Sequence, residues 1–492
     1  MAKVMFLIQR EDLDPSRAVM RKVLFPIETA FAAALLKSKG HEVGAFDLNL
    51  MEEGDSWLRR FRGALEGFSP DIVVSAPQTL TFLIRENIGE TAAAFSVAKS
   101  VDASIKTVYC GQAATSYPGK AFSEARPDYL IRGEYEEPLA AFAERADVSG
   151  SFENIPGLAS GIVEAEAIPP RPSVFFGSLP FPAYEEFEYE KYFDFRGKGN
   201  IRHAEHSRRH THYLTSRGCS ARCCFCNVSY LRGSRVHQVR PVVSVLDDLE
   251  RITLELGVQE IHFLDENMTL SRKRTLEICR GIAERRLDFK WIPSGGLSVY
   301  SLNRQILENL KASGCYRLNL AIESGSQDAL KNIIRKPVNL KKAAEVVRIA
   351  RELDFEIICF FVIGFPGETR AQIEETLSLA ANPDFDYVTI SIATPQAGTE
   401  LEKICEKDGL IEKGRMLADI SKRSTGVFST DQFSLYELEE IRWKKWDEIN
   451  FSTEKRILKI QKMMGVSLEE LNEIRERTRT NFLSRWRDRD SI

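Results

Sequence analysis

Four cysteines lie within eight residues near the middle of the chain, at Cys219, Cys223, Cys224 and Cys226, whereas the other five are scattered singly. A tetrahedral zinc site normally takes its ligands from two separated pairs, and no later Cys-x-x-Cys or histidine pair supplies the second half. Three closely spaced thiolates instead suit an iron–sulfur cluster in which one iron lacks a protein ligand. We predict that Cys219, Cys223 and Cys226 bind such a cluster and that Cys224 is a spare thiol.

The cysteines lie at the start of a block in which short strand patterns alternate with helical patterns. Strands are predicted at 213–216, 260–264, 290–293, 317–321, 356–362 and 386–391, and helices at 242–256, 272–283, 303–312, 340–353 and 371–381. Six units of this kind predict a parallel, incomplete (β/α)6 barrel, whose site is built from the loops that follow the strands. The cysteine motif comes directly after the first predicted strand.

An amino-terminal block shows the same alternation and predicts a separate α/β domain. Strands are predicted at 4–8, 42–46, 71–75, 107–110 and 129–131, and helices at 28–38, 57–66, 81–99, 119–125 and 137–144. This order predicts a doubly wound, flavodoxin-like parallel sheet, which binds ligands at the carboxyl ends of its strands. The predicted organisation is a domain at 1–146, a proline-rich linker at 147–205, the barrel at 206–406 and a helical region at 407–492, with helices at 435–448 and 468–487.

Charge and composition narrow the class of protein. The chain of 492 residues has 67 basic and 71 acidic residues, a formal net charge of −4, which argues against a nucleic-acid binder as a whole. No apolar run approaches the ~20 residues of a membrane span. The first residues hold only a short apolar run, so we expect a cytoplasmic protein with reduced cysteines.

Residues 196–240 are strongly basic, with ten Lys or Arg, one acidic residue and five of the seven histidines. Three interpretations stay open at this point: a solvated or cofactor-facing basic surface, a pocket for a phosphate- or carboxylate-bearing substrate, and a docking face for an acidic electron donor. A histidine-based zinc site is the least favoured explanation, because an irregular basic loop produces similar spacing.

The motif formed by Cys219, Cys223, Phe225 and Cys226 resembles the Cys-x3-Cys-x-aromatic-Cys signature of the radical S-adenosylmethionine (SAM) enzymes. The segments 323–326 (Glu-Ser-Gly-Ser) and 364–368 (Gly-Phe-Pro-Gly-Glu) also resemble that family. The resemblance implies that the open iron chelates SAM and that further contacts come from Phe225, Asp265, Ser294, Glu323, Ser324 and Glu368. The alternatives are turn chemistry at both segments, and helix capping by Glu368 and near Asp265.

The amino-terminal block and linker resemble the cobalamin-binding subclass of the same family. The resemblance rests on the segments 109–112 (Tyr-Cys-Gly-Gln), 128–134 (Asp-Tyr-Leu-Ile-Arg-Gly-Glu), 155–157 (Ile-Pro-Gly) and 179–182 (Leu-Pro-Phe-Pro). It implies cobalamin contacts from Gln78, Thr79, Gly111, Gln112, Gly133 and Glu134. The chain has no Asp-x-His-x-x-Gly motif, so we expect cobalt without a histidine ligand; the alternative is a flavodoxin-like domain with no ligand.

The two resemblances together imply a cobalamin-dependent radical SAM methyltransferase that methylates an unactivated carbon of a small molecule, with electrons from ferredoxin or flavodoxin. A family member that uses the same cofactors for cyclisation or rearrangement is one alternative, and a non-catalytic cobalamin or redox sensor is another. A methylthiotransferase is less favoured, because that class has three extra amino-terminal cysteines and here only Cys110 precedes the signature. The pattern assigns no individual catalytic residue.

Overall fold

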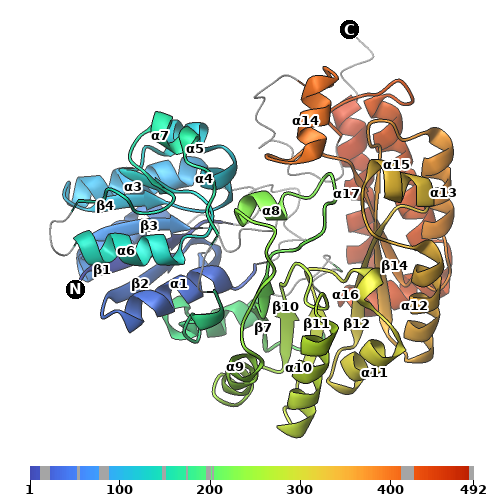
Figure 1. Cartoon of the computed structure of the whole chain (residues 1–492), viewed down its shortest axis with the longest axis horizontal. Helices are drawn as coiled ribbons and strands as arrows, with labels where there is room; N and C mark the ends of the chain where they lie inside the picture. The colour runs from blue at the N-terminus through green and yellow to red at the C-terminus, as the bar shows by residue number, and fades with distance from the viewer. Residues whose placement is uncertain are drawn as a thin grey trace. The chain divides into compact units, whose positions relative to one another are not determined.

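The computed structural model describes residues 1–10, 23–51, 56–76, 88–146, 151–172, 176–195, 201, 204–411 and 426–486. These residues divide into two compact units that do not follow chain order (Figure 1). Unit 1 holds the described residues of Met1–Leu13, Val23–Phe195 and Val228–Arg240, and unit 2 holds those of Arg196–Asn227 and Pro241–Ile492. In the described part of the chain, no helix has the length and apolar content needed to cross a bilayer.

Unit 1 is built on a six-stranded sheet of order β2-β1-β3-β4-β5-β6. Its first five strands are parallel, and only β6 pairs antiparallel with its neighbour. The strands are β1 (Lys3–Ile8), β2 (Glu42–Asp47), β3 (Ile72–Ala76), β4 (Lys106–Tyr109), β5 (Tyr129–Ile131) and β6 (Leu158–Ala159). The β2-β1-β3-β4-β5 order is that of a flavodoxin-like doubly wound sheet, so the predicted fold class is confirmed.

Helices cover the sheet of unit 1 because their buried faces are rich in Ala, Leu and Phe. They are α1 (Ile27–Ser38), α2 (Trp57–Phe68), α3 (Ile88–Val101), α4 (Gln112–Ser116), α5 (Pro118–Ala125), α6 (Glu136–Ala146) and α7 (Ile162–Ala167). Side chains of α2, α3 and α5 join β1, β3 and β4 in one apolar core. The short helices α4 and α7 were not predicted, and residues 81–87 of the predicted third helix lie outside the described residues.

Unit 2 contains the predicted six strands in parallel, in the order β7-β10-β11 and β12-β13-β14. Isolated bridges such as Leu297 to Leu320 join the two halves. The strands are β7 (His210–Tyr213), β10 (Glu260–Phe263), β11 (Lys290–Pro293), β12 (Arg317–Glu323), β13 (Glu356–Ile363) and β14 (Tyr387–Ile392). The predicted strand at 213–216 starts three residues too late, because His210 and His212 are polar in type and yet fully buried in β7.

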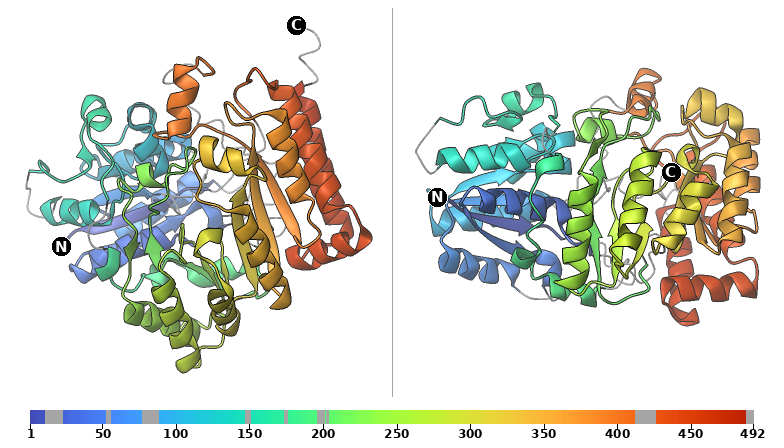
Figure 2. Two further views of the ribbon diagram at one scale, coloured as in Figure 1. Left: turned by 45° about the vertical axis from the view of Figure 1, so that its right-hand side comes forward. Right: turned by 60° about the horizontal axis from the view of Figure 1, so that its bottom comes forward.

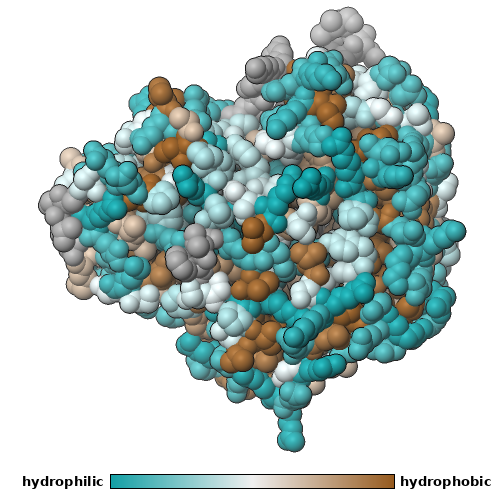
Figure 3. Space-filling model, in the orientation of Figure 1, coloured by the Kyte–Doolittle hydropathy of each residue, from teal (hydrophilic) through white to brown (hydrophobic). Residues whose placement is uncertain are grey.

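The helices that follow the strands are α9 (Val242–Leu254), α10 (Arg272–Glu284), α11 (Arg304–Ala312), α12 (Leu340–Glu352) and α13 (Arg370–Ala380). Figure 2 shows them along the outside of the strands. The chain then forms α14 (Glu400–Lys407), α15 (Leu435–Asn450), α16 (Glu454–Met464) and α17 (Leu468–Trp486). On the face seen in Figure 3, hydrophilic residues predominate on the side of unit 2 where α12 and α13 lie.

Helix α15 covers the free edge of β14. The side-chain amide of Asn450 accepts a hydrogen bond from Val388 N (2.8 Å) and donates one to Val388 O (3.0 Å), and Arg442 donates to Ile390 O (3.1 Å). These bonds satisfy backbone groups that a further strand would otherwise pair with. The carboxyl-terminal helices therefore complete the open side of the incomplete barrel.

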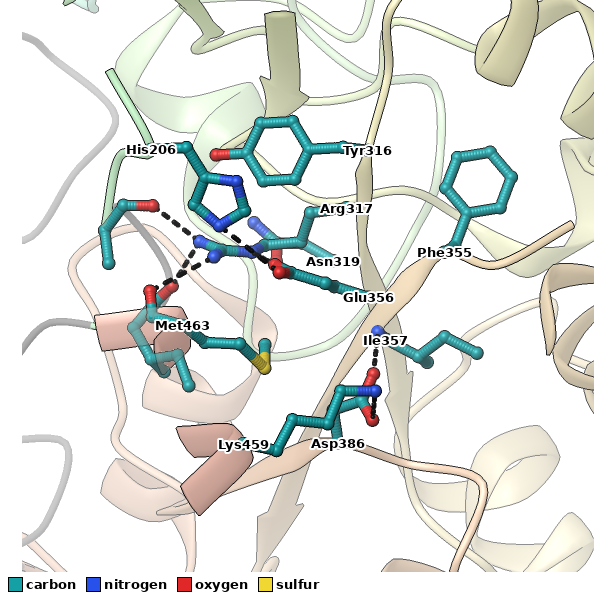
Figure 4. A network of polar contacts seen from close by, with 12 residues as sticks. His206, Tyr316, Arg317, Asn319, Phe355, Glu356, Ile357, Asp386, Lys459 and Met463 are labelled. Carbon is teal, nitrogen blue, oxygen red and sulfur yellow. Dashed lines mark hydrogen bonds and ion pairs between the residues drawn. The ribbon is translucent and has the colours of Figure 1, made fainter. Parts of the chain in front are cut away.

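The amino-terminal end of the barrel is closed by buried charged and polar side chains (Figure 4). The guanidinium of Arg317 donates to Ile201 O (2.9 Å), Ala204 O (2.7 Å) and Met463 O (3.3 Å) and pairs with Glu356 at 2.7 Å. Arg317 is fully buried. A buried guanidinium with this many acceptors is stable only where its charge is paired and its donors are used.

Candidate functional site

The loop that carries the cysteines is fixed at its start by two acidic residues that follow β10. Asp265 is 2% exposed and accepts bonds from Thr215 N (3.0 Å), Thr215 Oγ1 (2.6 Å) and Ser216 Oγ (2.6 Å). Burial raises the pKa of the Asp265 carboxyl, and these hydrogen bonds oppose the rise. Glu266 accepts from Gly218 N at 3.0 Å, directly before Cys219. The two carboxylates thus set the path of the chain into the cysteine motif, a role that the sequence did not indicate.

Cys224 is buried, whereas the other three cysteines of the motif are partly exposed. Its backbone N–H donates to Ile334 O and its carbonyl accepts from Leu401 N of α14, both at 2.9 Å. The side chain is 3% exposed, and burial together with the nearby Cys223 raises the pKa of its thiol to about 12. The backbone contacts tie Cys224 to the residues before α12 and to α14.

Cys219, Cys223 and Cys226 are all partly exposed. Burial raises the pKa of the Cys223 thiol, Lys336 opposes that rise, and Glu323 and Cys219 add to it. Among the described residues, no three His, Cys, Asp or Glu side chains converge on the position of one metal ion. In a four-iron cluster each cysteine binds a different iron, so three thiols on one loop fit that group.

Glu323 ends β12 beside the cysteines and forms an ion pair with Lys336. The two side chains are 8% and 9% exposed, and Lys336 Nζ lies 2.7 Å from Glu323 Oε1. Burial lowers the pKa of Lys336, but the charges of Glu323, Cys223 and Cys226 raise it more, so the net pKa is raised. Lys336 is thus a cation held next to Cys223 and Cys226, and the sequence analysis missed it.

The backbone at Glu323 is in the left-handed region, with φ 72°, and the register of β12 against β13 shifts between Ala321 and Glu323. A non-glycine residue rarely adopts this conformation, and bulges next to active sites often re-aim a side chain. The bulge turns Glu323 toward Lys336 at the open end of the barrel.

Aromatic side chains border the same loop. The ring centroids of Phe225 and Phe365 are 5.7 Å apart, so the aromatic residue of the cysteine motif packs against the loop after β13. The pKa of the Tyr300 hydroxyl is raised, chiefly by burial. Cys219 and Cys223 lie near enough to add to that rise. The Tyr300 hydroxyl accepts from Asn267 Nδ2 at 3.0 Å. Tyr300 was not a predicted site residue.

Ser324 and Gly325 face helix α13 and not the cysteines. Ser324 Oγ lies 3.0 Å from Thr376 Oγ1 and accepts from Ser326 N at 3.1 Å. A Cβ at Gly325 would lie 2.3 Å from Glu375 O, so only glycine permits this approach of the loop to the helix. This geometry favours a positioning role for Ser324.

Glu368 bonds to the backbone of its own loop. Its Oε2 accepts from Gly364 N (2.6 Å) and Phe365 N (3.1 Å), and the side chain is fully buried. Burial raises the pKa of this carboxyl to about 7, and the two backbone bonds oppose the rise. Helix α13 is capped by Thr369 together with Gln372, not by Glu368. The carboxylate holds Phe365 where it meets Phe225.

Ser294 follows β11 and is fully buried. A Cβ on the next residue, Gly295, would lie 1.9 Å from Asp265 O, so the chain after β11 runs against the backbone that follows β10. Ser294 therefore lies in the interior, next to the backbone that follows β10, rather than on an open surface.

In unit 1, the predicted cobalamin residues that are described lie at the carboxyl ends of β4 and β5. Gly111 precedes α4 with φ 112° and ψ −159°, a conformation open to glycine. A Cβ at Gly133 would lie 2.3 Å from Arg171 O, so this glycine serves a close backbone contact. Gln112 begins α4 and is partly exposed. Gln78 and Thr79 lie outside the described residues.

Glu134 is fully buried in an ion-pair triad. The guanidinium of Arg232 lies 3.1 Å from Glu134 and 2.5 Å from Glu28, and all three side chains are at most 1% exposed. Arg240 is also buried and donates to Leu179 O at 2.8 Å. The basic segment 196–240 is therefore not one solvated surface, because Arg232 and Arg240 are buried in unit 1 and bind other residues of that unit.

Comparisons with known proteins agree with this geometry. Residues 213–380 match the profile of the radical SAM superfamily. The chain is 25% identical over 447 residues to the cytidylyl-2-hydroxyethylphosphonate methyltransferase of Streptomyces wedmorensis, covering 81% of this chain and 82% of that protein. It is 28% identical over 399 residues to an uncharacterized methyltransferase of Pyrococcus horikoshii, covering 79% and 81%.

The fold is similar to that of the radical SAM methyltransferase TsrM from Kitasatospora setae, whose structure contains cobalamin and a [4Fe-4S] cluster. The TM-score is 0.72 at 15% identity, covering 98% of this chain and 100% of that one. At that identity the likeness is one of fold, and it confirms the α/β architecture of both units.

Proposed function

We propose that this chain, in which residues 213–380 form a radical SAM domain, is a cobalamin-dependent radical SAM methyltransferase acting on a small molecule. The observation that carries the proposal is the grouping, in one unit, of three partly exposed cysteines with the buried pair of Glu323 and Lys336. The relatives named above are methyltransferases of similar length. When bound, the cluster supplies the electron that cleaves SAM to a carbon radical, and cobalamin carries the methyl group.

The residues of unit 2 fit these tasks. Cys219, Cys223 and Cys226 would hold the cluster, and Asp265 and Glu266 fix the loop that presents them. SAM carries a carboxylate and an ammonium group. Lys336 suits the first and Glu323 the second, and charge-assisted bonds of this kind are the strong ones in a buried setting. Phe225 and Phe365 supply an apolar surface beside them.

The residues of unit 1 fit a ligand at the carboxyl ends of its strands. Gly111 leaves the loop after β4 without a side chain, so a large ligand can approach the backbone there. In the described part of unit 1, His41 lies directly before β2, at the opposite end of the strands, and its Nδ1 accepts from Ala2 N at 3.1 Å. Because the chain has no Asp-x-His-x-x-Gly motif, we propose corrin binding without a histidine ligand to cobalt. Electron delivery by a ferredoxin or flavodoxin and a cytoplasmic location belong to the same proposal.

The test uses SAM with a deuterated methyl group and needs no knowledge of the substrate. Protein reconstituted anaerobically with iron, sulfide and hydroxocobalamin should retain about one corrin per chain. Under reducing conditions it should form 5′-deoxyadenosine and carry the deuterated methyl group in its corrin fraction. A corrin-bound protein that forms 5′-deoxyadenosine but takes up no label would instead support cyclisation or rearrangement. Absence of 5′-deoxyadenosine would support a sensor.

Matched cysteine variants test the cluster assignment in the same assay. Replacing Cys219, Cys223 and Cys226 together by alanine should abolish the iron–sulfur absorption and 5′-deoxyadenosine formation. Cys224→Ala should retain both, because the Cys224 side chain is 3% exposed and its backbone is bonded to Ile334 and Leu401. Equal loss in the two proteins would show that the wrong three sulfurs were assigned.

A further inference from the structure

The inner surface of β12, β13 and β14 differs in solvent exposure and in charge from one end of the barrel to the other. Strand residues alternate in direction, so every second residue faces the barrel interior. In the half nearest the carboxyl ends, one set of alternate residues is partly exposed: Ala321, Phe360, Val362, Thr389 and Ser391. The residues between them are buried; Phe361, Val388 and Ile390, for example, are at most 2% exposed.

Two contacts show which set faces inward. Phe361 packs on Phe385, which lies in the connection between α13 and β14, with ring centroids 6.1 Å apart, and Arg351 of α12 affects the pKa of Cys359, so that set faces the outer layer. On the other side, a Cβ at Gly296, which follows β11, would lie 3.5 Å from the Phe360 ring. Phe360 and its alternates therefore face the barrel interior, where solvent reaches them.

Charged groups occupy the two ends of this surface but not its middle. At the amino-terminal end, Arg317 and Glu356 are paired with each other, and Arg317 also binds three backbone carbonyls (Figure 4). At the carboxyl end, Glu323 and Lys336 are paired. In the described strands β12–β14, the inward side chains between these pairs are apolar, amide or hydroxyl groups.

The geometry points to this band as the binding surface for the part of the substrate that reacts. Ala321, Phe360 and Val362 offer apolar contact, and Thr389 and Ser391 each offer a hydroxyl group. The substrate portion bound there is uncharged and mainly apolar, with one or two hydrogen-bonding groups, because a carboxylate or phosphate would lose its water and find no free cation in the band. Phe360 sets how deep the ligand can enter. This inference rests on the proposed function, and it names the substrate class of the same site.

The closing experiment measures binding of matched probes to the cluster-reconstituted full-length protein. The probes are 2-naphthol, which is uncharged near neutral pH, and 2-naphthoate, which has a carboxylate on the same ring system. Equilibrium dialysis should show 2-naphthol binding at least about tenfold tighter than 2-naphthoate, a difference of ~1.4 kcal/mol. Equal binding of the two, or no binding of 2-naphthol, would overturn the inference.

Variants locate the bound probe. Ala321→Phe fills the band from a partly exposed position and should weaken 2-naphthol binding about tenfold or more. Phe361→Leu changes the neighbouring, outward-facing side chain and should leave binding within about twofold. Equal effects of the two substitutions would overturn the assignment. Uptake of the deuterated methyl group by the corrin is measured on the same preparations. If the wild-type protein takes up no label, the proposed function is contradicted. Binding of the probes tests only the band, so the two failures can be told apart.

Discussion

A glutamate lies at the end of β12 and another in the loop after β13, and the two glutamates have different partners. Glu323 pairs with Lys336 beside the cysteines of the motif, whereas Glu368 accepts hydrogen bonds from two N–H groups of its own loop. Both side chains are buried and both follow neighbouring parallel strands. Position at the carboxyl end of a barrel strand thus does not by itself give a carboxylate a ligand-binding role. The role of each carboxylate depends on whether a cation or a backbone N–H group lies next to it.

The largest expected effect comes from removing the cation of this comparison. Lys336→Met leaves Glu323 buried without its partner, which should destabilise the cofactor-free protein by about 3–5 kcal/mol. The adjacent Arg335, whose side chain is 51% exposed and paired with Glu400, is the matched control, and Arg335→Met should cost less than about 1 kcal/mol. Thermal unfolding of both variants checks this. Equal changes in the unfolding temperature of the two variants would mean that breaking the buried Glu323–Lys336 pair destabilises the protein no more than breaking an exposed pair does.

The second prediction is that the protein's stability depends on pH through Glu368, because the pKa of this carboxyl is raised. Its pKa of about 7 is above the usual 4.5, so the folded protein holds this proton more tightly than the unfolded chain does. The contribution of Glu368 to the free energy of unfolding is fully present below about pH 4.5 and is lost as the pH rises through about 7. The loss amounts to about 3 kcal/mol for a fully buried group. Glu368→Gln removes the titration.

The measurement compares thermal unfolding of wild type and Glu368→Gln between about pH 5 and pH 8. The difference in stability between the two proteins should change over that range in favour of the glutamine variant as pH rises. All other titrating groups are common to both proteins and cancel. Parallel curves would show that Glu368 has an ordinary pKa.

The third prediction asks which glutamate contacts SAM. Glu323→Gln keeps the volume of the side chain but removes its charge, and should weaken SAM binding to the cluster-reconstituted protein about tenfold, or ~1.4 kcal/mol. Glu368→Gln should change that affinity less than about twofold. Anaerobic isothermal titration measures both, with iron content as the control for an intact cluster. The reverse order of effects would exchange the two roles.

The sequence predicted the strands well because most are runs of buried β-branched and aromatic residues; β11 was predicted to the residue. It misplaced β7, where buried histidines replace apolar side chains. It could single out the cysteines and Glu323 as candidates because their spacing and their positions at strand ends are local features; their roles stay predictions. It could not find Lys336, which lies 13 residues from Glu323 and meets it only through the path of the intervening turns. Nor could it show that Asp265 bonds to Thr215, 50 residues away.

The smallest expected effect tests the remaining difference within the loop after β12. Ser324 shares the loop with Glu323, but its hydroxyl bonds to Thr376 and to Ser326 N. Ser324→Ala removes those bonds while Thr376 still accepts from Gly325 N at 3.0 Å, so the loss of stability should be about 1 kcal/mol. Because the hydroxyl faces α13, SAM affinity measured by titration should stay within about twofold of wild type. A tenfold loss would instead place Ser324 in contact with SAM, as the family resemblance implies, and would require the loop to turn away from α13 when SAM binds.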